Sequence, residues 1–191
     1  MGFDRHKIAE GVRLILQGVG EDLSRPGLER TPERVAEMYE EVLAGIGADA
    51  LEVLQVLPGP GHDEIIMVRD IPVQSLCEHH MLPFSGRAHV AYVPNRDGRI
   101  TGLSKIARLV DTLSKRLQVQ EHLTTQIADA LEKALEPRGV FAMIEAEHLC
   151  MTMRGIKKPG SVTVTSAVRG VFRTDARTRT EALELIRRSS G

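Results

Sequence analysis

The sequence predicts an α+β fold in which two helices lie on one face of an antiparallel four-stranded sheet. The order of its periodic segments is the first reason: two helical segments, then strand, strand, helix, helix, strand, strand, and a closing helix. Paired strands on either side of paired helices favour hairpins over parallel crossovers. The second reason is the length of 191 residues, which suits one domain with a full hydrophobic core.

The N-terminal part of the chain is expected to form two helices. Apolar residues recur at helical spacing from residue 4 to residue 19 and predict the first helix. Thr31 as the N-cap and Pro32 in the first turn predict where the second helix begins. Gly45 or Gly47 is expected to end it.

A loop rich in proline and glycine, residues 58–61, follows these helices. We expect residues 1–60 to form an N-terminal helical segment and residues 61–191 to form the main domain, the two making one structural unit. Alternating apolar residues predict the first two strands at residues 64–71 and 86–93, and the stretch between them has no clear period.

The second half of the chain combines both periods. Apolar residues at helical spacing predict one helix around Leu109 and another that Pro137 ends. Period-two alternation predicts the last two strands at residues 140–151 and 161–172. A helix over residues 178–188 is expected to close the chain.

The composition is that of an average soluble globular protein. Hydrophobic residues make up 42%, charged residues 27%, and the formal net charge is −1, which argues against disorder and coiled coil. Only two cysteines are present, which excludes a disulfide-rich secreted scaffold. No stretch approaches the ~18 apolar residues of a membrane span, and no apolar signal core follows the first methionine. We therefore expect a cytoplasmic protein with no membrane partner.

Charge is unevenly distributed along the chain. Acidic residues outnumber basic ones in residues 1–64, and the reverse holds in residues 65–191. The basic part could attract a phosphorylated ligand or a nucleic acid, or it could be a solvated face. Aromatic residues amount to only 3% and offer few platforms for stacked bases, so we expect no nucleic-acid partner.

The stretch from Cys77 to His80 is the most informative in the sequence. Cys77 and His80 have two residues between them, a spacing that lets one loop offer sulfur and nitrogen to a single Zn²⁺ ion. Cys150 would add a second thiolate, and three ligands leave a fourth position for water, as in catalytic sites. With His79 or His148 as a fourth ligand the site would be structural. Without a metal both cysteines would be small buried hydrophobes.

His79 and His148 are also candidates for acid–base catalysis. Histidine titrates near neutrality, so either could act beside a metal-activated water. Alternation along the predicted strand 140–151 places His148 and Cys150 on the same face. The alternative for His148 is a core histidine bonded to a backbone carbonyl.

A second group of residues suits an anion. Ser104, Lys105 and Arg108 fall in the first turn of a predicted helix, where backbone N–H groups and two cations could bind a phosphate. Solvated helix charges are the alternative. Arg154 could bring another cation to the end of the strand that carries Cys150, whereas local pattern suggests no partner for Arg34.

Gln120 and Glu121 open the helix that Pro137 ends. A carboxylate in the first turn of a helix ordinarily complements the helix dipole. If Glu121 were buried, it would also suit the adjacent N–H groups of a guanine edge. Both interpretations remain open at this point.

Several blocks of the sequence, taken in chain order, form a combination that is far more specific than any one motif. The chain resembles the zinc-dependent GTP cyclohydrolase I family in these blocks, from about residue 8 to the C-terminus. They are Val19–Asp22, Arg30–Tyr39, Cys77–His80, Gly102–Lys105, Gln118–Glu121, Glu147–Cys150 and Arg154–Gly155, with weaker similarity at Lys158–Ser161 and Thr178–Arg179.

The resemblance implies a fold, an assembly and a reaction. It implies the tunnelling fold, with the strand and helix order predicted above, and a homodecamer of two pentameric rings with active sites between subunits. It implies that GTP and water are converted to 7,8-dihydroneopterin triphosphate and formate, the entry step to folate or other pterins. Zn²⁺ is the implied cofactor, although a thiolate and imidazole site could also hold Fe²⁺ or Co²⁺.

The resemblance also implies a role for each matching residue. The metal ligands are Cys77, His80 and Cys150. The catalytic residues are His148, as proton donor to the guanine imidazole ring, His79, and Ser104 near the ribose. The guanine is recognised by Gln120 and Glu121, and the triphosphate by Arg34, Lys105, Arg108 and Arg154.

The chain departs from the family pattern at His122, where arginine is usual, and at Ala182, where an aromatic residue is frequent. The alternative to an enzyme is a family relative that binds zinc and a nucleotide without turnover. The intact pair of His79 and His148 argues against that alternative.

Overall fold

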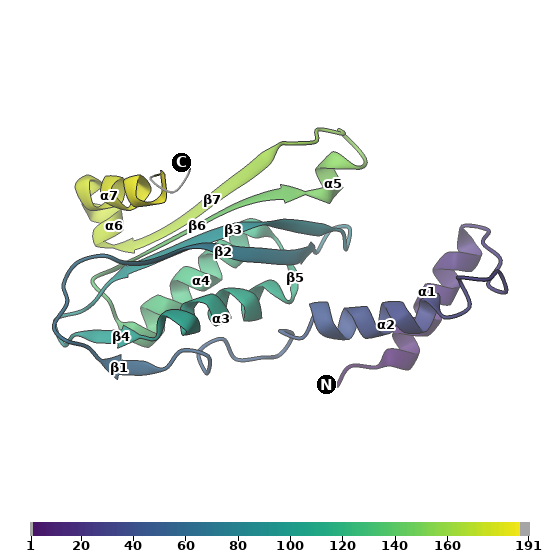
Figure 1. The fold of residues 1–191 in the computed structure, drawn as a ribbon, viewed down its shortest axis with the longest axis horizontal. Helices are drawn as coiled ribbons and strands as arrows, with labels where there is room; N and C mark the ends of the chain where they lie inside the picture. The colour runs from purple at the N-terminus through teal and green to yellow at the C-terminus, as the bar shows by residue number, and fades with distance from the viewer. Residues whose placement is uncertain (1, 188–191) are drawn as a thin grey trace.

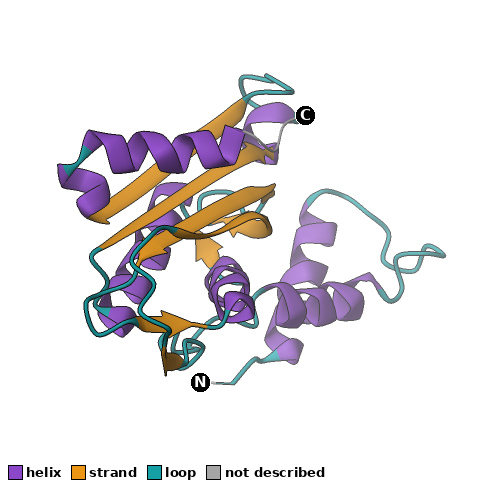
Figure 2. Ribbon diagram, turned by 60° about the vertical axis from the view of Figure 1, so that its left-hand side comes forward, coloured by secondary structure: helices purple, strands orange, loops and turns teal. Residues whose placement is uncertain are grey.

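The computed structural model describes residues 2–187. The main domain is a twisted sheet between layers of helices, and a pair of N-terminal helices stands beside it (Figure 1). Figure 2 shows the strands enclosed between the two helical layers. Within the described residues, no helix is both long and apolar enough to cross a membrane.

The main sheet has the strand order β5-β2-β3-β6-β7. Its four long strands are antiparallel, as predicted, and are β2 (Ile66–Cys77), β3 (Pro83–Val93), β6 (Gly139–His148) and β7 (Val162–Gly170). The short strand β5 (Leu117–Gln118) adds to the edge in parallel with β2 and was not predicted. A separate two-stranded sheet, also not predicted, pairs β1 (Val56–Pro58) with β4 (Arg99–Thr101).

Helices α3 (Leu103–Ser114) and α4 (Gln120–Leu135) cover one face of the sheet, as predicted. Their apolar stripes form most of the core, in contact with inward-facing residues of β3 and β6 such as Val90 and Ile144. This burial is the main stabilising contribution to the fold. The stripes consist of Ile106, Leu109, Val110 and Leu113 on α3 and Leu123, Ile127, Leu131 and Leu135 on α4.

The opposite face of the sheet is partly covered by the C-terminal helices α6 (Val171–Thr174) and α7 (Ala176–Arg187). Phe172 and Ala182 are fully buried there against Ala91, Phe141 and Met143 of the sheet. A small residue at position 182 thus lets α7 lie close to the strands. The predicted closing helix begins two residues earlier than expected, and residue 188 lies outside the described residues.

The N-terminal helices are α1 (Arg5–Gly18) and α2 (Thr31–Val42), which contact each other. The range of α1 agrees with the prediction, whereas α2 ends at Val42, before the predicted Gly45 or Gly47. The predicted cap of α2 is wrong by one residue, because Thr31 is already helical and its hydroxyl donates to the carbonyl of Gly27. Gly45 anchors the connection to the main domain. Its N–H donates to the carbonyl of Lys115, and the Arg116 guanidinium donates to its carbonyl.

Three strand boundaries differ from the prediction at the end of the sheet that carries the candidate site. Strand β3 begins at Pro83 instead of residue 86. Strand β2 continues to Cys77 instead of ending at residue 71, because a bulge at Asp70, with φ of +57°, shifts the alternation by which strands are recognised. Strand β6 ends at His148, opposite Phe84, and the chain then turns into the short helix α5 (Leu149–Thr152). The predicted strand 140–151 is therefore too long, and Cys150 does not share a strand face with His148.

Candidate metal centre and catalytic residues

A tight turn between β2 and β3 brings His80 back over Cys77. The N–H of Met81 donates to the carbonyl of Cys77, and the N–H of Cys77 donates to the carbonyl of Leu82. Met81 has a φ of +54°, in the left-handed region that such turns require. The neighbouring N–H of Glu78 donates to the carbonyl of Gln118 in β5. The short edge strand thus fixes the start of the turn.

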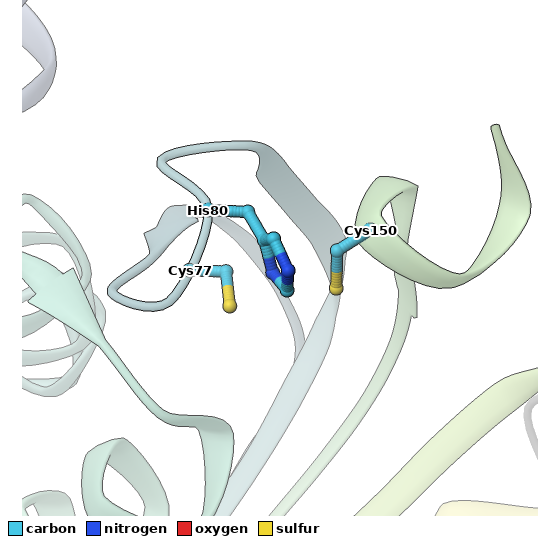
Figure 3. A group of neighbouring side chains, drawn as sticks. All are labelled: Cys77, His80 and Cys150. Carbon is cyan, nitrogen blue, oxygen red and sulfur yellow. The ribbon is translucent and has the colours of Figure 1, made fainter. Parts of the chain in front are cut away.

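Cys77, His80 and Cys150 converge from this turn and from α5 (Figure 3). One ligand atom from each residue lies within 4.8 Å of the other two. Zinc bonds of ~2.0–2.3 Å place tetrahedral donors roughly 3.3–3.8 Å apart, so a small closure would bring all three onto one ion. The structure confirms that these three predicted ligands come together.

The electrostatics of the two thiols favour a cation between them. Burial raises the pKa of the Cys150 thiol, and the nearby Cys77 raises it further. Two facing thiolates would repel each other, and a divalent ion removes that cost by binding both. The donor set of two sulfurs and one imidazole is one that Zn²⁺ prefers.

Arg154 also reaches this group. Its Nη1 lies 2.9 Å from Nε2 of His80. A guanidinium can only donate, so Nε2 of His80 accepts and carries a lone pair. Zinc bound through Nε2 would therefore have to displace this contact with Arg154.

His79 and His148 come from the two segments that carry the candidate ligands, the turn after β2 and the end of β6 just before α5. His148, the last residue of β6, stacks on Phe84 with ring centroids 4.6 Å apart and an angle of 8°. Its Nε2 lies 2.7 Å from Oε1 of Gln120. Burial lowers the pKa of His148, and the nearby Glu121 carboxylate opposes that shift. His79 is exposed in the turn, with its Nδ1 3.8 Å from Sγ of Cys77.

Gln120 and Glu121 begin α4 beside His148, and their environments differ. Gln120 is 1% exposed, and its Nε2 donates to the carbonyls of Ile144 and Thr163. Glu121 is exposed, so the buried glutamate considered from the sequence is not present in this chain. The Glu121 carboxylate is therefore accessible to a ligand next to His148.

The predicted anion-binding residues of α3 do not join the metal group within one chain. Ser104, Lys105 and Arg108 lie at the beginning of α3, whereas β5, which pairs with Cys77, follows its end (Figure 1). A helix rises ~1.5 Å per residue, so the 12 residues of α3 span roughly 18 Å between these sites.

The two cations of α3 line a separate cavity of about 430 Å³. Lys105 and Arg108 contribute to its wall together with the acidic residues Asp49, Glu52 and Asp111. Arg34 is exposed on α2, and its side chain makes no hydrogen bond or ion pair with any of residues 2–187. Of the four predicted triphosphate cations, Arg154 is the one that makes a hydrogen bond to the metal group among residues 2–187.

Comparison with known proteins places these features in a family. The profile of the GTP cyclohydrolase I family matches residues 8–187. The chain belongs to the GTP cyclohydrolase I family. Relatives named GTP cyclohydrolase 1 include that of Caldanaerobacter subterraneus subsp. tengcongensis, 59% identical over 183 residues, which are 96% of this chain and 97% of the relative. The proteins of Carboxydothermus hydrogenoformans and Mycobacterium tuberculosis are each 58% identical, over 96% and 97% of this chain and 95% and 92% of their own lengths.

The convergence of Cys77, His80 and Cys150 agrees with what the family resemblance implied for these three residues. Family membership alone does not identify the residues that hold His148 in place. Phe84 and Thr165 were not identified from the sequence, although Phe84 directly follows the metal-binding turn. The signal that could have indicated Phe84 is a large apolar residue at the first inward position of a strand that starts after that turn.

Proposed function

We propose that this chain hydrolyses the imidazole ring of GTP, releases formate and rearranges the product to 7,8-dihydroneopterin triphosphate. One observation carries the proposal: Cys77, His80 and Cys150 converge next to His148 in a member of the GTP cyclohydrolase I family. This is the entry step to folate or other pterins, in the cytoplasm. The rest of the site is assigned from the contacts described above.

Cys77, His80 and Cys150 would hold a Zn²⁺ ion. When bound, zinc supplies Lewis acidity and lowers the pKa of a coordinated water from its bulk value toward ~7. The turn that carries Cys77 and His80 is fixed by backbone hydrogen bonds, so two of the three ligands are held in place by the fold.

His148 would carry a proton to N7 of the guanine ring, which makes C8 electrophilic. Its stacking on Phe84 and its bond to Gln120 hold the imidazole in one orientation. His79, exposed in the turn and adjacent to Cys77, would serve as the second proton carrier during ring opening and formate release.

Glu121 would recognise the guanine. Its exposed carboxylate can accept hydrogen bonds from N1–H and the 2-amino group at the same time. Its position beside His148 would place the imidazole part of the base near the proton donor. This pairing selects guanine over adenine, because the corresponding edge of adenine lacks both donors.

The triphosphate would be bound by Arg34, Lys105, Arg108 and Arg154, with Ser104 near the ribose. Because α3 separates Ser104, Lys105 and Arg108 from the metal group of the same chain, we infer that a neighbouring subunit supplies them. Strand β7 pairs only with β6 within the described residues, so its other edge is open for a strand of another subunit. Such pairing agrees with the tunnelling fold and a homodecamer of two pentamers.

The activity is tested by incubating the zinc-loaded chain with GTP. Formate release and fluorescence of the oxidised pterin product should rise together. A zinc-loaded chain that binds GTP but yields neither product would overturn the proposal and favour a nucleotide-binding protein without turnover.

The shared site is tested by co-expressing two variants, Cys150→Ser and Lys105→Ala. Each homo-oligomer should be inactive, and mixed oligomers should regain up to about a quarter of wild-type activity, because neighbours combine intact halves at random. If mixing restores nothing, each chain must complete its own site.

A further inference from the structure

The orientation of the Gln120 side chain is fixed by what surrounds it. Its Nε2 lies 3.0 Å from the carbonyl oxygens of both Ile144 in β6 and Thr163 in β7. Carbonyl oxygens only accept hydrogen bonds, so this end of the amide must be the NH₂ group. The amide oxygen therefore faces His148, at 2.7 Å from Nε2 of the imidazole.

This orientation decides which nitrogen of His148 carries the hydrogen. An amide oxygen can only accept, so Nε2 of His148 must donate. In the neutral ring Nδ1 then has the lone pair, and it makes no hydrogen bond to any of residues 2–187. Nδ1 is thus the nitrogen left for a substrate.

Thr124 and Thr165 form a closed ring of hydrogen bonds with Gln120. The Thr124 hydroxyl donates to the backbone carbonyl of Gln120 at 2.7 Å. Its single proton is thereby used, so in the 2.6 Å contact with Thr165 the Thr165 hydroxyl is the donor. Thr165 in turn accepts from Nε2 of Gln120 at 3.1 Å. The two hydrogens of Nε2 are thus shared among three acceptors, of which Thr165 is the most distant.

A reversed Gln120 amide would be costly. Gln120 and Thr124 are each 1% exposed, so water cannot replace a lost partner. Reversal would place Oε1 against two carbonyl oxygens. On the other side of His148, the ring of Phe84, also 1% exposed, fixes the imidazole plane by stacking. The hydrogen bond to Gln120 and the stacking on Phe84 therefore both limit rotation of the His148 imidazole.

We propose that Gln120, held by the carbonyls of Ile144 and Thr163, is a positioning residue that keeps His148 in the Nε2–H form with Nδ1 toward the substrate, and does not itself recognise the guanine. The inference rests on the proposed function for the role of His148. It assigns the amide of Gln120, for which the family resemblance implied a role with Glu121 in guanine recognition, to the support of the catalytic imidazole.

Kinetics of two variants test the proposal without changing a metal ligand. Gln120→Met keeps the length of the side chain and removes the amide oxygen that accepts from His148, whereas Thr165→Val leaves the carbonyls of Ile144 and Thr163 that hold the amide and serves as the control. We expect kcat for formate release to fall about 10-fold or more in Gln120→Met, in the range typical of lost supporting hydrogen bonds, with KM for GTP unchanged. Thr165→Val should stay close to wild type. An unchanged kcat in Gln120→Met, or a rise in KM alone, would overturn the positioning role.

A second measurement does not depend on turnover. Solid-state NMR of the zinc-loaded, ¹⁵N-histidine-labelled protein reports which ring nitrogen is protonated, and a His148→Asn variant identifies the signals of this residue. We expect the Nε2–H form in the wild type and in Thr165→Val, and a mixture of forms in Gln120→Met, which lacks the accepting oxygen. An Nδ1–H form in the wild type would refute the inference even if GTP is converted. Absence of conversion with the expected NMR signals would instead refute the proposed function alone.

Discussion

The thiols of Cys77 and Cys150 face each other within 4.8 Å, one at the end of β2 and the other in the short helix α5. Two such thiols and the imidazole of His80 form a site only when a cation holds them. We therefore predict that Cys150→Ser lowers bound zinc from about one ion per chain to a small fraction, because a hydroxyl is a much weaker ligand than a thiolate. Metal analysis of the purified variant measures the effect.

The control for this variant is Met153→Leu, at an exposed position just after α5. It changes a sulfur-containing side chain near the site without removing a proposed ligand, and it should keep a full complement of zinc. If Cys150→Ser also retained one zinc per chain, Cys150 would not be a ligand.

Glu121→Gln should weaken the recognition of guanine. The amide keeps the shape of the carboxylate but presents only one accepting oxygen, so one of two charge-assisted hydrogen bonds is lost. We expect kcat/KM for GTP to fall roughly 10–100-fold, in line with the ~1.5–3 kcal/mol of a hydrogen bond to a charged group. Inosine triphosphate, which lacks the 2-amino group, should be discriminated against less by the variant than by the wild type.

The matched control is Glu132→Gln, a substitution of the same type at an exposed position near the other end of α4. It should leave the specificity for GTP over inosine triphosphate unchanged. Equal specificity in Glu121→Gln and wild type would remove Glu121 from the recognition of the base.

The helices and long strands could be predicted because the apolar residues of each element recur with a single period. Leu109 and Val110 on α3 belong to an apolar stripe with helical spacing, and burial of that stripe decides the element. Strand β2 was underestimated because the bulge at Asp70 moves the following residues to the opposite faces. Strand β5 is only two residues long, too short for any periodic signal.

The proposed metal ligands could be predicted from the sequence, but the residues that hold His148 in place could not. Cys77 and His80 are close in sequence, and Cys150 is the only other cysteine, so residue type alone suggested the group. The role of Gln120 depends on Thr163 and Thr165, which come from a strand far along the chain. A local sequence pattern does not show which distant carbonyls will accept hydrogen bonds from an amide. These partners of Gln120 come together only when β6 and β7 pair beside α4.

Gly86→Ala should destabilise the protein strongly. Gly86 lies opposite Ala146 in the ladder between β3 and β6, and an added Cβ would lie 1.8 Å from the carbonyl oxygen of Glu145. Neither backbone can move without breaking the pairing that also positions Phe84 and His148. We expect a loss of roughly 3 kcal/mol or more in unfolding free energy.

The comparison for Gly86→Ala is Gly11→Ala, in the interior of α1 with nothing within 4 Å of the added methyl group. That change should stabilise α1 by ~0.5–1 kcal/mol, because alanine favours the helix over glycine. Chemical denaturation of both variants measures the difference. Similar denaturation midpoints for Gly86→Ala and wild type would contradict the close contact between the backbones of β3 and β6 at Gly86.

His89 should make the protein less stable in mild acid. It is 3% exposed in β3, its Nδ1 accepts from the N–H of Asp70, and its Nε2 lies 3.8 Å from Oε2 of Glu145. Burial lowers the pKa of His89 below its usual 6.5, against the opposing charges of Asp70 and Glu145. A proton on Nδ1 would also replace the lone pair that accepts from Asp70.

The sign of the effect follows from the lowered pKa of His89. Above about pH 6.5 both the folded and the unfolded chain hold His89 neutral, and its full contribution to stability is present. As the pH falls below that value, the unfolded chain takes up a proton first, so stability is lost until the folded pKa is passed. The slope from one histidine is at most ~1.4 kcal/mol per pH unit.

The variant His89→Gln distinguishes the effect of this residue on stability from that of other titrating groups. Glutamine does not titrate in this pH range, and its side-chain oxygen can still accept from the N–H of Asp70. The difference in melting temperature between about pH 7.5 and about pH 5.5 should be smaller in His89→Gln than in wild type. His62→Gln, at an exposed histidine, is the control and should keep the wild-type difference. If His89→Gln showed the same loss on acidification as His62→Gln, the buried imidazole would not be a source of the acid sensitivity.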